Sequence, residues 1–223
     1  MKQISMLAAA ASLAFAVSHS SPSLASDQTD LIRSATRTAE HMQRDPAFDA
    51  ARHMLHSARA VLIVPSLVKG GFIFGAEGGD GVLMARAHHG WSYPAFYTMA
   101  SASFGLQIGL EQAEIVLLIM SDRALRAVER SQFKFGAGAG LTVVTLSAGA
   151  EGATAPNLTG DIIIWTSATG AYGGLTLNGS IIKSREEWDN DFYGHSVTVP
   201  QIMSGRARNP EANPLREEVS SIW

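Results

Sequence analysis

The chain of 223 residues contains no cysteine, which excludes disulfides, thiol nucleophiles and thiolate metal sites. It also has little net charge, since 17 Lys and Arg stand against 20 Asp and Glu and leave −3 at pH 7. The chain as a whole therefore lacks the excess of positive charge that is typical of proteins that bind nucleic acid. Hydrophobic residues make up 46% of the sequence, and this share predicts one globular domain with a substantial core.

Catalytic motifs are absent as well. The sequence has no G-x-S-x-G nucleophile elbow and no H-E-x-x-H zinc motif. Two histidine pairs, His53 with His56 and His88 with His89, have no acidic or histidine partner at a spacing typical of a metal site. We therefore expect a protein without enzymatic activity, bound metal or cofactor.

Residues 1–25 have the features of a secretory signal peptide. Lys2 precedes an apolar run from Ile4 to Val17, and Ser23 and Ala25 are the small residues that a signal peptidase requires. The run is about 14 residues long, shorter than the roughly 20 of a membrane-spanning helix. No cysteine is present to carry a lipid anchor. We expect a periplasmic or secreted protein with a cleaved signal peptide.

Residues 26–60 are predicted to form a helical part. The first helix has an apolar side, made of Leu31, Ile32, Ala35, Ala39 and Met42, and a basic side, made of Arg33, Arg37, His41 and Arg44. Asp45 ends it, because a residue before proline is pushed out of the α region. A second helix has the apolar stripe Phe48, Ala51, Leu55 and Ala58, with Arg52, His56 and Arg59 beside it.

Two interpretations of these helices stay open. Either they pack on a sheet and expose solvated charges, or their arginines contact lipid phosphates, at about 1 kcal/mol for each arginine near an anionic surface. Residues 27–60 contain five Arg and five Asp or Glu. The helical part is therefore amphipathic but not polybasic.

Residues 61–198 are predicted to be a β-rich body, and residues 61–183 hold 19 of the 21 glycines. The stretch VKGGFIFGAEGGDGVLMAR, residues 68–86, lacks the lysine and hydroxyl residue that end a phosphate-binding loop. We interpret it as a β-hairpin with strands 71–77 and 82–88. The turn would be Gly78-Gly79-Asp80-Gly81, because glycine tolerates positive φ.

Aromatic-glycine pairs recur along this body, at Phe74-Gly75, Phe104-Gly105, Phe135-Gly136 and Tyr172-Gly173. Glycine within a strand marks a bend or a bulge, so we predict an α+β fold with a strongly curved, mainly antiparallel, barrel-like sheet. From Phe135 to Ile182 only Glu151 and Asp161 are charged. Such strands are buried on both faces or have one face against something apolar, such as lipid.

The remaining predicted strands are residues 91–98, 102–109, 114–120, 133–138, 141–147, 161–167 and 172–182. A short helix is predicted within residues 121–131, capped by Ser121 or Asp122, with Leu125 and Val128 facing inward. Another is predicted within residues 184–192, with Ser184 and Glu187 as a capping box. Residues 199–223 are assigned to a polar tail with three prolines, in which a last helix begins at Pro214.

Four long segments resemble the SYLF domain family from about Phe48 to Phe192. They are ARAVLIVPSLVKGGFIFGAEGGDGVLMAR, GWSYPAFYTMASASFGLQIGLEQAEIVLLIMSDRAL, FKFGAGAGLTVV and DIIIWTSATGAYGGLTLNGSIIK. The resemblance implies phospholipid binding without catalysis, with phosphoinositides as ligands in eukaryotic members. It also implies membrane contact through a basic amphipathic N-terminal segment. In this sequence the corresponding residues are Arg33, Arg37, Arg44, Arg52 and Arg59, with Lys69 at the hairpin.

We therefore expect a non-enzymatic phospholipid-binding protein of the bacterial cell envelope. Residues 26–198 would form the lipid-binding domain, whose arginines dock anionic head groups and whose charge-poor sheet contacts acyl chains. The expected partner is an anionic phospholipid or membrane surface. Two alternatives stay open: an envelope protein that binds a protein partner, and an outer-membrane β-barrel.

Overall fold

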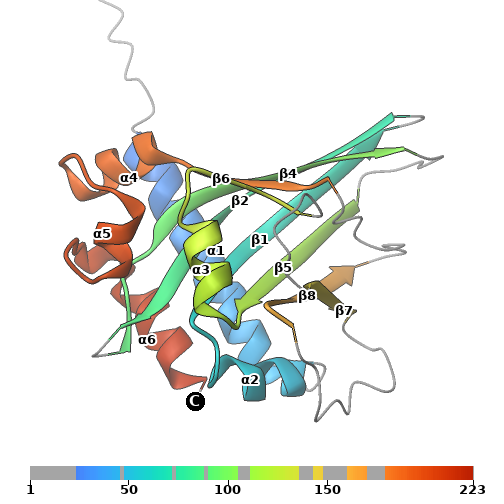
Figure 1. The fold of residues 1–223 in the computed structure, drawn as a ribbon, viewed down its shortest axis with the longest axis horizontal. Helices are drawn as coiled ribbons and strands as arrows, with labels where there is room; N and C mark the ends of the chain where they lie inside the picture. The colour runs from blue at the N-terminus through green and yellow to red at the C-terminus, as the bar shows by residue number, and fades with distance from the viewer. Residues whose placement is uncertain are drawn as a thin grey trace, which may run out of the picture.

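The computed structural model describes residues 24–45, 48–71, 74–87, 90–104, 111–135, 143–147, 160–169 and 179–222. They form a curled sheet with helices on both of its sides (Figure 1). The helices are α1 (Leu24–Arg44), α2 (Asp49–Leu55), α3 (Asp122–Val128), α4 (Glu186–Tyr193), α5 (Val199–Met203), the 3-10 helix η2 (Pro210–Ala212) and α6 (Asn213–Ser221). The strands are β1 (Ala60–Gly71), β2 (Phe74–Ala87), β3 (Gly90–Trp91), β4 (Ala95–Phe104), β5 (Glu111–Ile119), β6 (Gln132–Lys134), β7 (Val143–Ser147), β8 (Ile162–Thr169) and β9 (Ile181–Ser184).

The strands of the described residues form one sheet in the order β6-β9-β4-β2-β1-β5-β8-β7, and β3 pairs with β2. Neighbouring strands are antiparallel, except for the parallel pair β7 and β8. The sheet curls into a half-barrel (Figure 1). The predicted α+β class and the curved, mainly antiparallel sheet are therefore confirmed.

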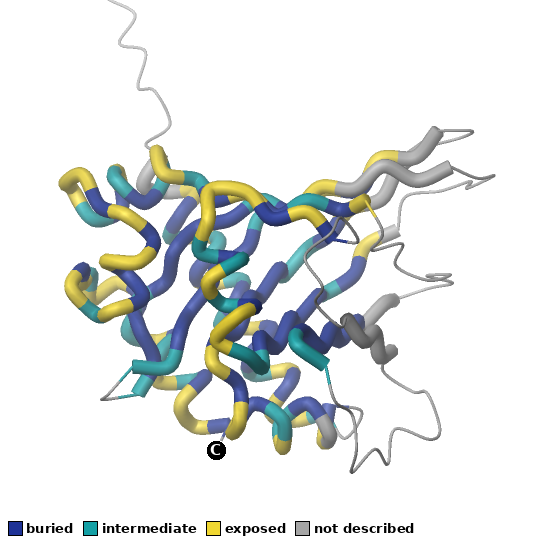
Figure 2. Tube along the Cα trace, in the orientation of Figure 1, coloured by how far each residue is buried: buried dark blue, intermediate teal, exposed yellow. Residues whose placement is uncertain are grey.

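Both faces of this sheet are apolar. Buried side chains form one apolar cluster on the concave side of the curled sheet and another on its convex side. Successive residues of a strand point to opposite sides, so in β1 Leu62 belongs to the concave cluster and Ile63 to the convex cluster. Figure 2 shows the central strands buried along most of their length. In β8, Ile162 and Ile164 face the concave side, while Ile163 and Trp165 face the convex side. Burial on both faces explains why the residues Ile162–Trp165 of β8 carry no charge.

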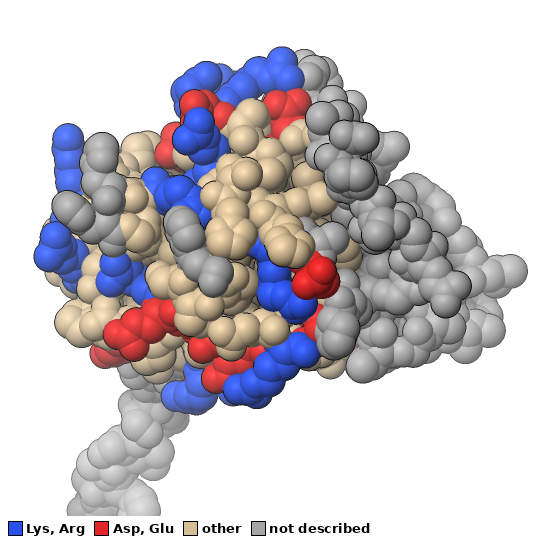
Figure 3. All heavy atoms as spheres, turned by 90° about the horizontal axis from the view of Figure 1, so that it is seen from below, with Lys and Arg blue, Asp and Glu red and all other residues tan. Residues whose placement is uncertain are grey.

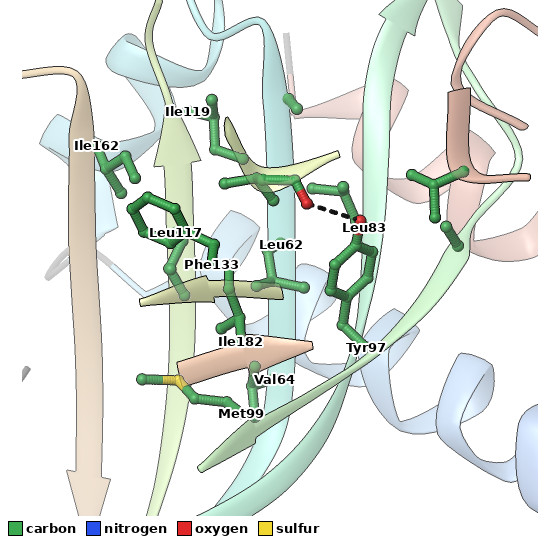
Figure 4. Packing of buried hydrophobic residues seen from close by; sticks show 14 of the residues in the cluster. Leu62, Val64, Leu83, Tyr97, Met99, Leu117, Ile119, Phe133, Ile162 and Ile182 are labelled. Atoms are coloured by element: carbon green, nitrogen blue, oxygen red, sulfur yellow. Dashed lines mark hydrogen bonds between the residues drawn. The ribbon is translucent and has the colours of Figure 1, made fainter. Parts of the chain in front are cut away.

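Side chains fill the concave side of the half-barrel in the described part of the chain (Figure 4). Helices α3 and α5 and strand β6 cover this side, with Val128 and Ile202 buried in the cluster. The hydroxyl of Tyr97 donates to the carbonyl oxygen of Val128 at 3.1 Å and so ties β4 to α3. The Ser121 hydroxyl caps α3 by accepting from the Ala124 N–H at 3.2 Å, so of the two predicted caps, Ser121 and Asp122, the first is the N-cap.

Helices α1, α2, α4 and α6 cover the convex side. The predicted apolar side of the first helix is buried or half-buried, and Phe48, Ala51, Leu55 and Ala58 are buried beside it. The predicted apolar side of the first helix is therefore confirmed, whereas Phe48 and Ala58 are buried outside α2, which runs from Asp49 to Leu55. Helix α4 differs from its prediction at its start: Ser184 belongs to β9, and Arg185 is the N-cap without a side-chain cap. The capping box of Ser184 and Glu187 is therefore wrong.

The predicted tail is a folded part of the structure up to Ile222. Its two α-helices bury Ile202 on the concave side and Leu215 and Val219 on the convex side. Helix α6 lies along α1, where the Gln43 side-chain amide donates to the Ser221 hydroxyl at 3.1 Å. The last helix begins one residue before Pro214.

The glycine-rich stretch forms a hairpin with a different layout from the predicted one. Residues 78–81 lie inside β2 rather than in a turn, and β1 is its partner. The register of β1 shifts between Ile63 and Val68, where Pro65 has no N–H to offer a neighbouring strand. A Cβ added at Gly81 would lie 2.7 Å from the Ile63 carbonyl oxygen, and one at Gly79 would overlap the Ser66 carbonyl. These glycines permit a close backbone approach, and they do not have positive φ.

Substitution of Gly79 tests this close approach. We expect Gly79→Ala to lower the free energy of unfolding by about 1–3 kcal/mol, because the new methyl group meets the backbone of Ser66 and Leu67. Gly78→Ala is the matched control, since only the Met99 carbonyl oxygen stands near its added Cβ, at 4.0 Å. Urea unfolding of both variants gives the comparison. Equal losses at the two positions would contradict this account of the glycines.

Candidate functional site

Three of the predicted lipid-binding residues share the exposed side of α1. At 100° per residue, Arg33, Arg37 and Arg44 fall within about 40° of one another, over about 16 Å of helix. The side chains of Arg33 and Arg44 are 62% and 73% exposed. We call these three residues the arginine face. The structure brings them together as the sequence predicts.

Polar groups on the same helix engage this arginine face. Arg33 pairs with Asp30 at 2.6 Å, Arg44 pairs with Glu40 at 3.6 Å, and Arg37 donates to the Ser34 hydroxyl at 2.9 Å. Pairs of this kind, three or four residues apart, are neighbours on a helix surface. Figure 3 shows basic and acidic side chains interspersed on the face seen from below, rather than gathered into a basic patch. The positive charge of the arginine face is therefore partly offset.

The convex side of the sheet holds α1 in place through a polar contact. Glu114 of β5 accepts from the Thr38 hydroxyl at 2.8 Å and contacts His41 Nδ1 at 2.7 Å. His41 Nε2 in turn lies 3.3 Å from Asp45. These contacts fix the rotation of α1, so that the arginine face points to solvent.

The other predicted site residues lie apart from the arginine face. Arg52 is a structural residue of the α1–α2 corner: its guanidinium donates to the carbonyl oxygens of Met42 and Asp45, both at 2.8 Å, at the end of α1. Arg59 pairs with Asp122 of α3 at 3.2 Å. Lys69 lies in β1 opposite Glu77 of β2 and Glu111 of β5, and its side chain is outside the described residues.

A groove of about 850 Å³ opens on the sheet beside the start of α4, and we call it the edge groove. It is lined by Asp80, Thr98, Ala100, Ser131, Gln132, Ile181, Lys183, Ser184, Arg185, Glu186, Glu187 and Trp188. Arg185 pairs with Asp80 at 2.9 Å and stacks on the Trp188 ring, 3.4 Å from its centroid. Lys183 is exposed, and its side chain has neither a hydrogen bond nor an ion pair in the part of the chain that the structure describes.

The edge groove is not encoded by any one stretch of the sequence. Its walls come from β2, β4, β6, β9 and α4, and strand pairing brings Thr98 opposite Lys183 although 85 positions separate them. No local motif encodes that pairing. The cluster from Lys183 to Trp188, with two cations, two acids and an indole beside a strand, is the only local hint.

Helix α4 is attached to β4 through a buried carboxyl group. Asp189 Oδ1 accepts from the Phe96 N–H at 2.8 Å, whereas Oδ2 has no hydrogen-bond partner among the described residues. Burial raises the pKa of the Asp189 carboxyl from 3.8 to about 7, the Phe96 N–H lowers it in part, and Glu186 raises it further. The Tyr193 hydroxyl also holds α4, by donating to the Pro94 carbonyl oxygen at 2.7 Å.

The described residues contain no group of three His, Cys, Asp or Glu side chains arranged to hold a metal ion. None of their helices combines the length and the apolar character that crossing a bilayer requires.

Comparison with known proteins identifies the class. Residues 100–222, more than half of the chain, match the Ysc84 family, described as "Las17-binding protein actin regulator". The chain therefore belongs to this family, which is the SYLF family that its sequence resembles. The match extends past Phe192 to include α5 and α6, in agreement with their place in the fold.

Several curated proteins are similar to this chain. Protein YSC84 of Saccharomyces cerevisiae is 31% identical over 168 residues, which are 73% of this chain and 36% of the yeast protein. LAS seventeen-binding protein 3 of the same species is 30% identical over 167 residues, with the same two coverages. SH3 domain-containing YSC84-like protein 1 of Xenopus laevis is 32% identical over 181 residues, which are 76% of this chain and 52% of that protein. The chain thus spans between about a third and a half of these relatives.

The role of Arg52 predicts a loss of stability rather than a loss of binding. We expect Arg52→Ala to lower the free energy of unfolding by about 2 kcal/mol, because carbonyl groups at the end of α1 lose a charged donor. Arg44→Ala is the matched control, and we expect a change within about 0.5 kcal/mol, since its pair with Glu40 is exposed. Chemical denaturation measures both. Similar losses for the two variants would show that Arg52 does not have this structural role.

The buried Asp189 predicts a stability that depends on pH. Because its pKa is raised in the folded state, its contribution is complete below pH 3.8 and is lost as the pH rises through about 7. Asp189→Asn keeps an acceptor for the Phe96 N–H and cannot ionise. We expect this variant to lose that part of the pH dependence and to exceed the wild type in melting temperature at pH 8. Asp191→Asn, on the exposed side of α4, should keep the wild-type profile; an unchanged profile in Asp189→Asn would contradict the assignment.

Proposed function

We propose that this protein binds anionic phospholipid surfaces as a non-enzymatic module of the bacterial cell envelope, in the periplasm or outside the cell. The observation that carries the proposal is the arginine face, three guanidinium groups in one exposed row on a helix that is anchored by its opposite side. The implied lipid binding of the SYLF family supports it. Membership of a family described as binding and regulatory agrees with a role without catalysis.

The proposed contact is electrostatic and lies at the surface. Each arginine near an anionic bilayer contributes about 1 kcal/mol, which falls with salt because the charges are solvated. Asp30 and Glu40 pair with Arg33 and Arg44, so the free protein has less positive potential here than three arginines alone would give. We therefore propose modest, salt-sensitive binding.

Acyl chains have little room inside the described part of the half-barrel. Its concave side is filled by α3, α5 and β6, and large side chains such as Tyr97 and Phe135 are fully buried there. In β8 the residues Ile162–Trp165 are buried from both sides. We therefore propose contact with head groups at the surface rather than a lipid carried within these residues.

Binding of a protein partner is the second candidate function. The observation in its favour is the name of the relatives, among them LAS seventeen-binding protein 3 of yeast. Those names refer to proteins that are about two to three times as long as the matched part. A protein partner would be the better explanation if binding of the chain to vesicles did not depend on the charge of the lipid.

Vesicle co-sedimentation tests the lipid proposal. We expect the full chain to pellet with phosphatidylcholine vesicles that contain phosphatidylglycerol, and to be released by high salt. Vesicles of phosphatidylcholine alone are the control for the apolar run from Ile4 to Val17. Binding through that run would not depend on the charge of the lipid and would appear with these vesicles as well. Arg33→Glu, Arg37→Glu and Arg44→Glu together should weaken anionic binding about tenfold to a hundredfold.

A second variant makes the test sharper, because it has the opposite sign. Asp30→Asn with Glu40→Gln removes the two acidic partners and leaves every arginine in place, so we expect stronger binding to the anionic vesicles. Unchanged melting temperatures would show that both variants remain folded. If the wild type pellets equally with charged and neutral vesicles, or with neither, the proposed function is wrong and a protein partner becomes the better candidate.

A further inference from the structure

The exposed cations without a polar partner lie away from the arginine face. Among the described residues, the side chains of Arg126, Arg130, Lys134 and Lys183 have neither a hydrogen bond nor an ion pair. Arg126 has only a longer-range attraction to Glu129. All four belong to α3, β6, β9 or the link between α3 and β6, and we call them the cationic edge. Arg206 and Arg208, which are also without such partners, follow α5.

Strand pairing sets the geometry of the cationic edge. In β6, Phe133 is buried while Gln132 and Lys134 are exposed, so both of the latter lie on the side of the sheet away from the concave cluster. Gln132 pairs with Lys183 of β9, which makes Lys134 a diagonal neighbour of Lys183, with about 7–8 Å between the Cα atoms in a typical pair of this kind. Both residues are cationic and lie on the same side of the sheet, so a bound anion would lower the repulsion between them.

Acidic groups surround the cationic edge but do not neutralise it. At the start of α3, Asp122 pairs with Arg59 at 3.2 Å, and Asp161 pairs with Arg123 at 2.8 Å. Asp80 is taken by Arg185. Glu129 is half-buried, and burial raises the pKa of its carboxyl. Glu186 and Glu187 are exposed in the first turn of α4, on another wall of the edge groove, and the cationic edge ends where that wall begins.

The edge groove adds hydrogen-bond donors to these charges. Lys183 lines it together with Gln132 and Ser131, whose side chains are exposed on the same strand edge. Ammonium, amide and hydroxyl groups all donate to phosphate oxygens. A head group at the wall formed by Lys183, Gln132 and Ser131 would therefore meet positive charge and donors at the same time, whereas Glu186 and Glu187 line another wall.

We infer that the cationic edge is a second contact of this protein with an anionic phospholipid bilayer, beside the arginine face, with Lys183, Lys134 and Arg130 against the lipid phosphates. This inference rests on the proposed function and adds a surface to the arginine face that carries it. Charge complementarity selects the occupant, because unpaired cations have no intramolecular interaction to give up when they meet lipid phosphates. Arginines that already pair with acids lose part of that gain.

The same vesicle assay distinguishes the two surfaces. The full-length chain is compared with two triple variants, Arg130→Ala/Lys134→Ala/Lys183→Ala and Arg33→Ala/Arg37→Ala/Arg44→Ala, which remove equal charge. On phosphatidylcholine vesicles with phosphatidylglycerol we expect each triple variant to bind at least about tenfold more weakly than the wild type. Arg206→Ala/Arg208→Ala controls for the loss of exposed cations without partners. Melting temperatures near that of the wild type would show that the variants are folded.

The outcomes separate this inference from the proposed function. If the wild type binds and the edge variant binds equally well, the inference is overturned while the proposed function stands. Failure of the wild type to bind anionic vesicles overturns both. Equal competition by soluble polyglutamate, at matched charge, would show a surface for acidic proteins and would also overturn the assignment to lipid.

Discussion

Burial of the sheet on both faces is the constraint on which the rest of this structure depends. In β1 and β8 every position of the central stretch is apolar, so neither face can meet water. The convex side needs α1, α2, α4 and α6, and the concave side needs α3 and α5. The interior is then occupied by protein, and polar chemistry is left to the outer sides of the helices and to the strand edges. A surface contact is the kind of function that this architecture favours.

Residues with a local periodicity were predictable from the sequence, and those that depend on pairing between distant segments were not. The apolar side of α1 follows from spacing at 100° per residue, and Ser121 from the preference for hydroxyl residues at helix N-caps. Gly79 and Gly81 show the limit. The closely spaced glycines of this stretch indicate a turn when the sequence is considered alone. In the structure they are needed because the backbone of β1 at Ser66 and Ile63 leaves no room for a Cβ, and no local pattern reveals that contact.

The candidate site divides in the same way. Periodicity alone places the row of Arg33, Arg37 and Arg44, and the structure confirms that they share an exposed side. The sequence counts their charges but does not say which are offset, since Asp30 and Glu40 act only through their position one turn away. The position of Arg52 beside the apolar stripe of its helix suggests a surface residue. Its guanidinium nevertheless donates to carbonyl groups at the end of α1, because the chain turns back at Asp45. The edge groove depends on the pairing of β4 with β9 and is invisible in the sequence.

Helix α4 connects the buried and exposed parts of this arrangement. Its inner side carries Asp189, a carboxyl held against the Phe96 N–H without a counter-charge, and its first turn carries Arg185 and Trp188 in the wall of the edge groove. Deprotonation of Asp189 places a charge where water cannot reach, so it weakens the attachment of α4 to β4. Because the same helix forms a wall of the groove beside Lys183, the shape of that groove depends on the protonation of a residue that is buried in the core. Charge at the surface and charge in the core are therefore coupled through one short helix.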